Sequence, residues 1–221
     1  MLELELMTTD AAFWNRIAEK YARQPVADAV AFERKIELTR ALMRPEHVVL
    51  EIGCGTGSLA LRLARSVGRY HGLDISPEMV RIAREKASTE GAENITFHIG
   101  PFDESFTVFS PGSLDGLCAY SILHLLGDRP ATLRRIFELL EPGGYFVSST
   151  VCLDESWVPY GPLIAVMRWF GRAPRVAVIA KKTLESEIQD AGFVDITSPD
   201  VGANAMIAFV VARKPGAREQ R

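Results

Sequence analysis

Hydrophobic residues along this chain fall into short apolar runs and into longer segments where apolar residues recur every three or four positions. The short runs favour β-strands, and the longer segments favour amphipathic helices. The predicted strands lie near residues 48–52, 70–74, 95–99, 114–120 and 144–151. The helices between them are predicted near residues 58–66, 77–88 and 130–140. This alternation predicts an α/β fold, with a mostly parallel sheet and helices on both faces.

The segments before and after this alternating region do not show the strand–helix alternation. Two helices, near residues 10–23 and 28–43, precede the first strand, and Pro25 lies between them. After the fifth strand, residues 152–182 combine aromatic residues with prolines and show only short helical patterns. We interpret this segment as a small cap insertion that covers the site.

The C-terminal part returns to regular structure. A helix is predicted from Thr183 to Gly192, followed by strands near residues 193–197 and 204–213. Because only a short turn separates these two strands, we expect them to pair antiparallel. We expect one domain over residues 1–221, made of N-terminal helices (10–43), a cofactor-binding core (45–151), the cap insertion (152–182), a helix with a strand pair (183–213) and a tail (214–221).

The most informative segment joins the first strand to the helix behind it. Apolar residues lead up to Glu51, and glycines follow at every second position, at Gly53, Gly55 and Gly57. Glycine has no Cβ, so the backbone can adopt positive φ and a ligand can approach it closely. The amides that open the next helix are unpaired and carry partial positive charge. The segment therefore predicts the front half of a βαβ nucleotide site.

A second acidic residue supports this prediction. Asp74 ends the second predicted strand, 17 residues beyond Gly57. A carboxylate at that place can accept both hydroxyls of a ribose, and a solvated turn residue is the alternative. A dinucleotide fingerprint would have a third glycine where this chain has Ser58. An NAD(P)-dependent oxidoreductase is therefore the weaker interpretation.

Four segments, in this order and spacing, resemble the class I S-adenosylmethionine-dependent methyltransferases of the small-molecule type. They are Leu50–Gly57, Gly72–Met79, Ser113–Leu126 and Leu140–Phe146. The lead-in helix around Trp14–Ala22 is also similar. The resemblance implies a Rossmann-like doubly wound sheet of seven strands, mostly parallel, with an antiparallel last strand. It also implies S-adenosyl-L-methionine as the cofactor and a small-molecule methyl acceptor.

The resemblance further implies which residues would hold the cofactor. They are Glu51, Gly53, Gly55, Gly57, Asp74, Ile75, Phe102, Asp103, Tyr120 and Ser121. The glycines would lie against the methionyl part and the ribose, and Asp74 would bind the ribose diol. Ile75 and Phe102 would pack on the adenine. Asp103 would accept a bond from the exocyclic amine, although Gly100-Pro101 stands where many members have Gly-Asp.

Each of three side chains has two possible roles. Glu51 would lie near the methionyl end of the cofactor, or it would be a strand-end charge that orders the glycine loop. His124 is a candidate general base because imidazole titrates at about pH 6.5, but its Leu-His-Leu-Leu setting equally suits packing or loop positioning. Tyr21 would cover the cofactor and is a second catalytic candidate, or it would be a core aromatic.

Composition narrows the class of protein. The 221 residues, 48% of them hydrophobic, suit one domain with an ordinary core. A net charge of −3 removes the main electrostatic support for a nucleic-acid partner. The three cysteines form no C-x-x-C pair and no cluster has zinc spacing, so we expect no metal and a reducing, cytoplasmic environment. The acidic N-terminus argues against a signal peptide, and the apolar runs are too short to span a bilayer.

The sequence leaves the methyl acceptor open. The aromatic and aliphatic residues of the cap favour a small apolar acceptor that is quinone-like, polyketide-like or a lipid. Whether oxygen, nitrogen or carbon is methylated is not indicated, nor is the choice between a monomer and a homodimer. A non-catalytic member that binds the cofactor and serves a partner protein is the second alternative.

Overall fold

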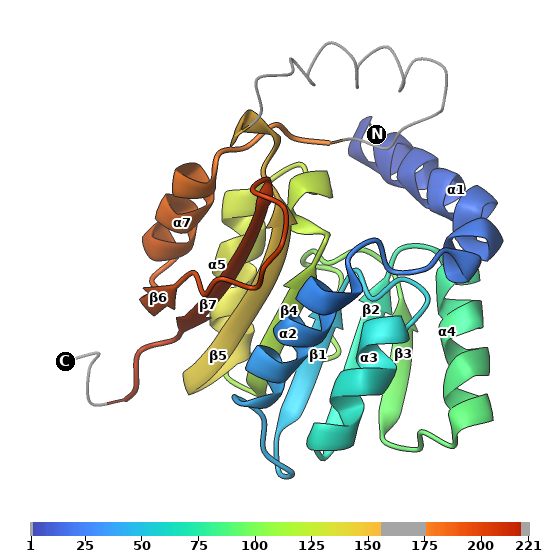
Figure 1. Ribbon diagram of the computed structural model, residues 1–221, viewed down its shortest axis with the longest axis horizontal. Coiled ribbons are helices and arrows are strands. Elements are labelled where there is room, and N and C mark those ends of the chain that lie inside the picture. The colour runs from blue at the N-terminus through green and yellow to red at the C-terminus, as the bar shows by residue number, and fades with distance from the viewer. Residues whose placement is uncertain (1, 156–175, 218–221) are drawn as a thin grey trace. The chain divides into compact units, whose positions relative to one another are not determined.

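A computed structural model describes residues 2–155 and 176–217 of the chain, and it describes side chains for residues 10–154 and 176–217. Two compact units divide the chain between Phe106 and Thr107. The strands form one seven-stranded sheet in the order β3-β2-β1-β4-β5-β7-β6, in which β7 runs antiparallel to both of its neighbours (Figure 1). This confirms the predicted Rossmann-like fold with an antiparallel last strand.

The first unit contains three parallel strands that were all predicted from apolar runs. They are β1 (Val48–Ile52), β2 (Arg69–Asp74) and β3 (Ile95–Ile99). The helices of this unit are α1 (Leu2–Arg23), α2 (Ala29–Arg40), α3 (Ser58–Leu63) with the short helix η1 (Ala64–Ser66), and α4 (Pro77–Glu90). The parallel strands bring the ends of β1 and β2 to the same edge of the sheet.

Local sequence explains how α4 begins and ends. Ser76 caps the helix, because its Oγ accepts a hydrogen bond from the Met79 amide at 3.1 Å. Pro77 occupies the first turn, where its missing N–H costs nothing. Gly91 ends the helix with a φ of +64°, which a residue without Cβ adopts readily. The cap fixes the turn between β2 and α4 directly beside Asp74.

The second unit contains the other four strands. They are β4 (Leu114–Tyr120), β5 (Leu140–Val151), β6 (Val194–Thr197) and β7 (Ile207–Arg213). Within its described residues, the helices are η2 (Leu123–Leu125), α5 (Arg129–Leu139), η3 (Leu153–Glu155) and α7 (Lys181–Asp190). The predicted antiparallel pairing of the last two strands is confirmed.

Aromatic packing holds the helices of the second unit on its strands. The ring of Phe193 lies 5.3 Å from that of Phe146 on β5 and 5.2 Å from that of Phe137 on α5. Lys214 closes the end of α5, because its ammonium group donates to the carbonyl oxygens of Phe137 and Leu140. Burying such rings contributes roughly 1.5–3 kcal/mol each, so this cluster holds α5 against β5.

Several predicted boundaries are wrong. The helix α7 begins at Lys181 instead of Thr183, because Ala180 is the extended cap residue and Leu184 and Ile188 set the buried face. Consequently the helix starts inside the predicted cap insertion. The helix α1 begins near the N-terminus instead of residue 10, although its first residues alternate leucine with glutamate, a pattern without helical period.

Most of the predicted cap, residues 156–175, lies outside the described residues. Within the described ranges, no helix has both the length and the apolar character needed to cross a membrane. Among these same residues, no group of three or more His, Cys, Asp or Glu side chains is arranged to hold a metal ion.

Candidate functional site

The glycine loop between β1 and α3 is the backbone of the candidate site in the first unit. Gly53, Gly55 and Gly57 all have positive φ, at 68°, 53° and 74°. A Cβ on Gly57 would lie 2.9 Å from the Cβ of Ala83 and 3.2 Å from the ring of Phe97. A side chain at that position would therefore be strained and would also clash. The spacing of glycines in the sequence reflects both requirements.

Glu51 is a buried acid at the end of β1, with 2% of its surface exposed. Its Oε2 accepts a hydrogen bond from the Tyr70 hydroxyl at 2.9 Å. Burial raises the pKa of Glu51 to about 8, the Tyr70 bond opposes this increase, and the nearby Asp74 charge adds to it. In the ligand-free protein at pH 7, the Glu51 carboxyl group is therefore mostly protonated.

Asp74 ties the glycine loop to the turn after β2. Its Oδ2 accepts from the Gly55 amide at 2.8 Å, and its Oδ1 accepts from the Ser76 amide at 2.9 Å. Burial raises the Asp74 pKa, while the two amide bonds lower it. A carboxylate offers about four acceptor positions, so two positions stay available to a ligand. These contacts are those of a loop organiser, unlike those of a solvated turn residue.

Tyr21 of α1 lies over the glycine loop. A Cβ on Gly55 would lie 3.9 Å from the Tyr21 Cε1 atom. Partial burial raises the pKa of the Tyr21 hydroxyl, and the charges of Asp74 and Glu51 raise it further. These charge effects place the phenol within electrostatic reach of both acids, yet 45% of the residue is exposed. An exposure of this size is larger than that of a core aromatic.

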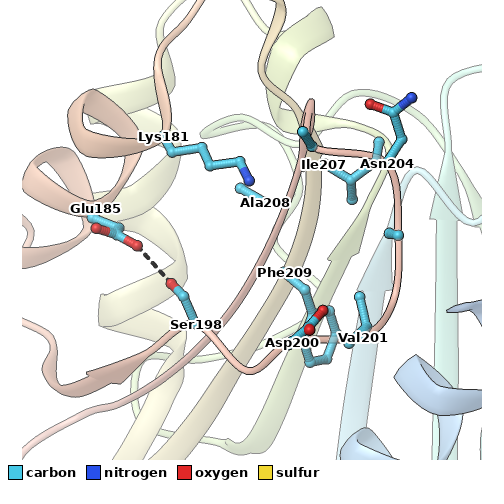
Figure 2. Close-up of a pocket in the computed structure, with 11 residues that line it drawn as sticks. Lys181, Glu185, Ser198, Asp200, Val201, Asn204, Ile207, Ala208 and Phe209 are labelled. Atoms are coloured by element: carbon cyan, nitrogen blue, oxygen red, sulfur yellow. Dashed lines mark hydrogen bonds between the residues drawn. The ribbon is translucent and has the colours of Figure 1, made fainter. Parts of the chain in front are cut away.

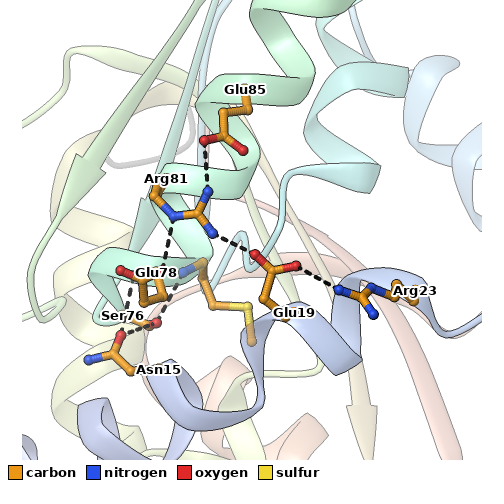
Figure 3. A network of polar contacts seen from close by, with 8 residues as sticks. Asn15, Glu19, Arg23, Ser76, Glu78, Arg81 and Glu85 are labelled. Atoms are coloured by element: carbon orange, nitrogen blue, oxygen red, sulfur yellow. Dashed lines mark hydrogen bonds and ion pairs between the residues drawn. The ribbon is translucent and has the colours of Figure 1, made fainter.

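A polar network holds α1 on the first turns of α4 (Figure 3). Asn15 Oδ1 accepts from the Ser76 hydroxyl at 2.6 Å and from the Glu78 amide at 3.2 Å. Arg81 of α4 bridges Glu78 and Glu85 on its own helix to Glu19 on α1. The charged pairs are largely exposed and contribute little each. Asn15 therefore gives the more specific contact, and it aligns the helix that carries Tyr21.

The residues predicted to bind the adenine are more exposed than Glu51. Ile75 and Phe102 are half-buried, and the Phe102 ring lies 6.3 Å from the ring of Phe106. Asp103 is exposed, and its Oδ1 accepts from the Ser105 amide at 2.8 Å. One carboxylate oxygen of Asp103 thus belongs to a local turn. The geometry joins Glu51, the glycines, Asp74 and Tyr21, and it leaves Asp103 on the surface.

In the second unit, Tyr120 and Ser121 lie where β4 ends. Tyr120 is half-buried and pairs with Ser149 of β5, and its ring lies 6.3 Å from that of Phe209 on β7. Ser121 is exposed and has a φ of +55°, which is uncommon for a residue with a Cβ. Its amide donates to the Ser149 carbonyl at 2.7 Å. This sharp turn sends the chain away from the sheet toward His124.

His124 is 8% exposed and lies in η2. Burial lowers the pKa of His124 to about 4, so the imidazole is neutral at pH 7. Its Nδ1 atom is buried and finds no hydrogen-bond partner among the described residues. Its carbonyl oxygen accepts from the Ala177 amide at 2.7 Å. A weakly basic imidazole held in this way fits loop positioning better than proton abstraction.

The second unit also has a pocket of about 310 Å³ that the sequence does not reveal (Figure 2). Lys181 and Glu185 of α7 lie on one side, and Ile207, Ala208 and Phe209 of β7 lie on the other. The loop between β6 and β7 closes it with Ser198, Asp200, Val201, Ala203, Asn204 and Ala205. Phe209 contacts both this pocket and Tyr120, so the pocket adjoins the end of β4.

Comparison with known proteins adds independent information. A family model described as a methyltransferase domain matches residues 44–190. The demethylmenaquinone methyltransferase of Symbiobacterium thermophilum is 28% identical over 82% of this chain and 83% of that protein. The uncharacterized methyltransferase YcgJ of Bacillus subtilis is 30% identical over 72% of this chain, which spans 59% of that protein. A ubiquinone biosynthesis O-methyltransferase of Xanthomonas campestris is 32% identical over 48% of this chain and 44% of that protein.

Solved structures agree with the fold. The crystal structure of the Bacillus subtilis YcgJ protein matches with a TM-score of 0.67 at 17% identity, covering 84% of this chain and all of that one. A possible histamine N-methyltransferase from Thermotoga maritima matches with a TM-score of 0.66 at 18% identity, covering 92% and 99%. At these identities the likeness supports the architecture, while the family rests on the sequence match.

Proposed function

This chain belongs to the family of class I S-adenosylmethionine-dependent methyltransferases, and we propose that it methylates a small, apolar organic acceptor. The main support for the proposed cofactor site is a cluster of residues around the glycine loop of the first unit. Two acids and a tyrosine face a loop of three positive-φ glycines there. No cationic side chain of the described residues pairs with either acid. A positively charged nucleoside fits such a cradle in charge and in backbone access.

We assign the parts of the cofactor as follows. The free acceptor positions of Asp74 would take the ribose hydroxyls, and the amides of the glycine loop would face the methionyl part. Ile75 and Phe102 would cover the adenine, with the remaining oxygen of Asp103 accepting from its amine. Tyr120 and Ser121 lie in the second unit where β4 ends, and they stay cofactor-binding candidates on the resemblance.

When bound, the cofactor supplies a methyl group that is already activated by the positive charge on sulfur. The chain therefore has to align the acceptor with this group and keep water away. Orientation alone can contribute roughly 7–11 kcal/mol to the rate. Tyr21 would cover the methionyl side of the loop, and Asn15 would hold Tyr21 in place through α1. His124 would position the chain after β4 and, being neutral with a low pKa, would not act as the base.

The acceptor class is supported by relatives and by composition. One relative is named a demethylmenaquinone methyltransferase, and another is named a ubiquinone biosynthesis O-methyltransferase. The cap insertion, residues 152–182, is rich in aromatic and aliphatic residues and follows β5. We propose that it selects a quinone-like or similarly apolar acceptor in one catalytic domain. We further propose a cytoplasmic enzyme, monomeric or homodimeric, without a nucleic-acid partner, because the net charge is −3 and the three cysteines are buried thiols.

Methyl transfer from tritiated S-adenosylmethionine tests this proposal. The protein would be incubated with a panel of hydroxylated quinone precursors, small polyketides, lipids and polar metabolites. Tritium in an organic extract of one apolar acceptor is the expected result. Transfer only to polar metabolites would overturn the acceptor class. Tight cofactor binding without transfer to any extract of small molecules would favour the non-catalytic alternative.

A further inference from the structure

We propose that Glu51 makes the cofactor site sensitive to ligand charge: it loses its proton when S-adenosylmethionine binds and keeps it when S-adenosylhomocysteine binds. This inference rests on the proposed function, because it concerns the same glycine-loop site. It adds a way to distinguish the cationic cofactor from the neutral thioether that remains after methyl transfer.

The geometry is that of a buried acid without a countercharge. Glu51 is 2% exposed, and its polar partner among the described residues is the neutral Tyr70 hydroxyl at 2.9 Å. The other acid, Asp74, bonds to the amides of Gly55 and Ser76. A charged carboxylate in such a place is unfavourable unless a cation lies near it. The two ligands share an α-ammonium group, and the sulfonium is the cation that S-adenosylmethionine alone brings.

Glu51 is the group of this site best placed to exchange a proton near pH 7. Burial raises its pKa to about 8. Tyr21 on α1 and Cys54 in the glycine loop both have a raised pKa and stay neutral in this range. Asp74 also has a raised pKa, but its two amide donors stabilise the ionised form, whereas Glu51 has a single phenol donor. A cation at the loop therefore acts first on Glu51.

The same group would respond when the methyl group leaves. Transfer breaks the bond between the methyl carbon and sulfur, and the electron pair of that bond stays on sulfur. A lone pair of the acceptor forms the new bond to carbon, and any proton displaced from the acceptor passes to solvent. The positive charge near Glu51 is then gone, so Glu51 takes a proton back from solvent. The product then lacks the charge interaction that S-adenosylmethionine makes with Glu51.

The pH dependence of binding to the unmodified protein tests the inference. Affinities for S-adenosylmethionine and S-adenosylhomocysteine would be measured by titration calorimetry at pH 6, 7 and 8. If binding of S-adenosylmethionine ionises Glu51 completely, and the free pKa is about 8, the affinity for S-adenosylmethionine rises roughly 50-fold from pH 6 to pH 8. The affinity for S-adenosylhomocysteine would lack this increase. The α-amino group titrates at about pH 7.7–8.0, but both ligands carry it, so it cancels in the ratio of affinities.

Proton release gives a second measurement. Titrations at pH 7 in phosphate and in Tris, two buffers with different ionisation enthalpies, should show about 0.9 proton released per bound S-adenosylmethionine for a pKa of about 8. Glu51→Gln should abolish this release and flatten the pH dependence. Glu46→Gln is the matched control, because Glu46 is an exposed acid just before the same strand, and it should behave as wild type.

The outcomes separate the inference from the proposed function. Equal pH dependence for the two ligands would overturn the charge sensing while leaving the cofactor site intact. Unchanged proton release in Glu51→Gln would assign the proton to another group and would also overturn it. Binding of neither ligand would overturn the proposed function itself. If Glu51→Gln does not fold, the ratio of the two wild-type affinities across pH still decides.

Discussion

The glycine-loop site of the first unit and the pocket of the second unit contain similar residue types in opposite surroundings. Glu51 is 2% exposed and bonds to a neutral phenol. In the pocket, Glu185 is half-buried and accepts from the Ser198 hydroxyl at 2.6 Å, and Asp200 is exposed. The surroundings of Glu51 penalise a negative charge, whereas Glu185 has a hydroxyl donor and Asp200 is open to water. The same carboxyl chemistry therefore responds to ligand charge in one place and stays solvated in the other.

This difference suggests how recognition divides between the two regions. Buried acids around a rigid loop can select a cation, because a charge is strongly felt where water is excluded. The pocket of the second unit combines the half-buried Glu185 and the exposed Asp200 with an apolar wall made by Val201, Ile207 and Phe209. Four substitutions test this contrast.

Asp74→Ala should have the largest effect on ligand binding. It removes the acceptor of two loop amides and the proposed ribose contact. Loss of a hydrogen bond to a charged acceptor costs roughly 1.5–3 kcal/mol, which is roughly 10- to 150-fold in affinity. Titration with S-adenosylhomocysteine measures this, and Asp74→Asn, which keeps one acceptor oxygen, should lose less. Wild-type affinity in Asp74→Ala would mean that the acid only organises the loop.

Glu51→Gln should change how the stability of the free protein depends on pH. In wild type the folded pKa of about 8 lies above the ordinary value of 4.5, so stability falls as pH rises between these values. Between pH 6 and pH 8 the loss is roughly 2 kcal/mol, at about 1.4 kcal/mol per pKa unit. Melting curves should show this loss in wild type and much less of it in the variant. If the stability of wild type and of Glu51→Gln changed in the same way with pH, Glu51 would already be ionised in the free protein, and the prediction would be wrong.

His124→Ala should reduce stability more than turnover. Removing a buried imidazole that the chain after β4 packs around should cost roughly 1–2 kcal/mol. Its folded pKa of about 4 is below the ordinary 6.5, so its contribution is lost as pH falls through that interval, and the variant should be less acid-sensitive. Thermal unfolding and turnover at saturating cofactor measure both effects. A thousandfold loss of turnover at an unchanged melting temperature would make His124 the general base.

Asp200→Asn should have the smallest effect. The residue is exposed, and an asparagine oxygen can still accept from the Gly202 amide as Asp200 does at 2.8 Å. Stability should change by no more than about 0.5 kcal/mol, equally at pH 6 and pH 8. The same melting curves used for Glu51→Gln provide the comparison. A pH-dependent change as large as that of Glu51 would remove the contrast between the two regions.

The sequence predicted those parts of the site that depend on neighbouring residues. The apolar run of β1, the alternate glycines and Asp74 follow local patterns, and the structure brings them together. Contacts between distant residues could not be predicted. Tyr70 reaches Glu51 across neighbouring strands, and Asn15 reaches Ser76 over 61 positions. Neither residue type signals its partner, since a tyrosine in a strand and an asparagine in a helix have many possible roles.

Other features were hidden for different reasons. The start of α7 depends on Ala180, a residue without a side-chain cap, so no capping signal marks it. The pocket is formed by the path of the loop between β6 and β7, which hydrophobic periodicity does not describe. Asp103 was expected to bind the adenine on the resemblance, yet the turn that it makes with Ser105 depends on backbone geometry that the sequence pattern does not describe.

The central claim is that the glycine loop, with Glu51 and Asp74, is a site for S-adenosylmethionine and its product rather than for a dinucleotide. Titration calorimetry of the unmodified protein with S-adenosylhomocysteine and with NAD tests this directly. We expect micromolar or tighter binding of S-adenosylhomocysteine and no measurable heat of binding with NAD. Micromolar binding of NAD without binding of S-adenosylhomocysteine would contradict it.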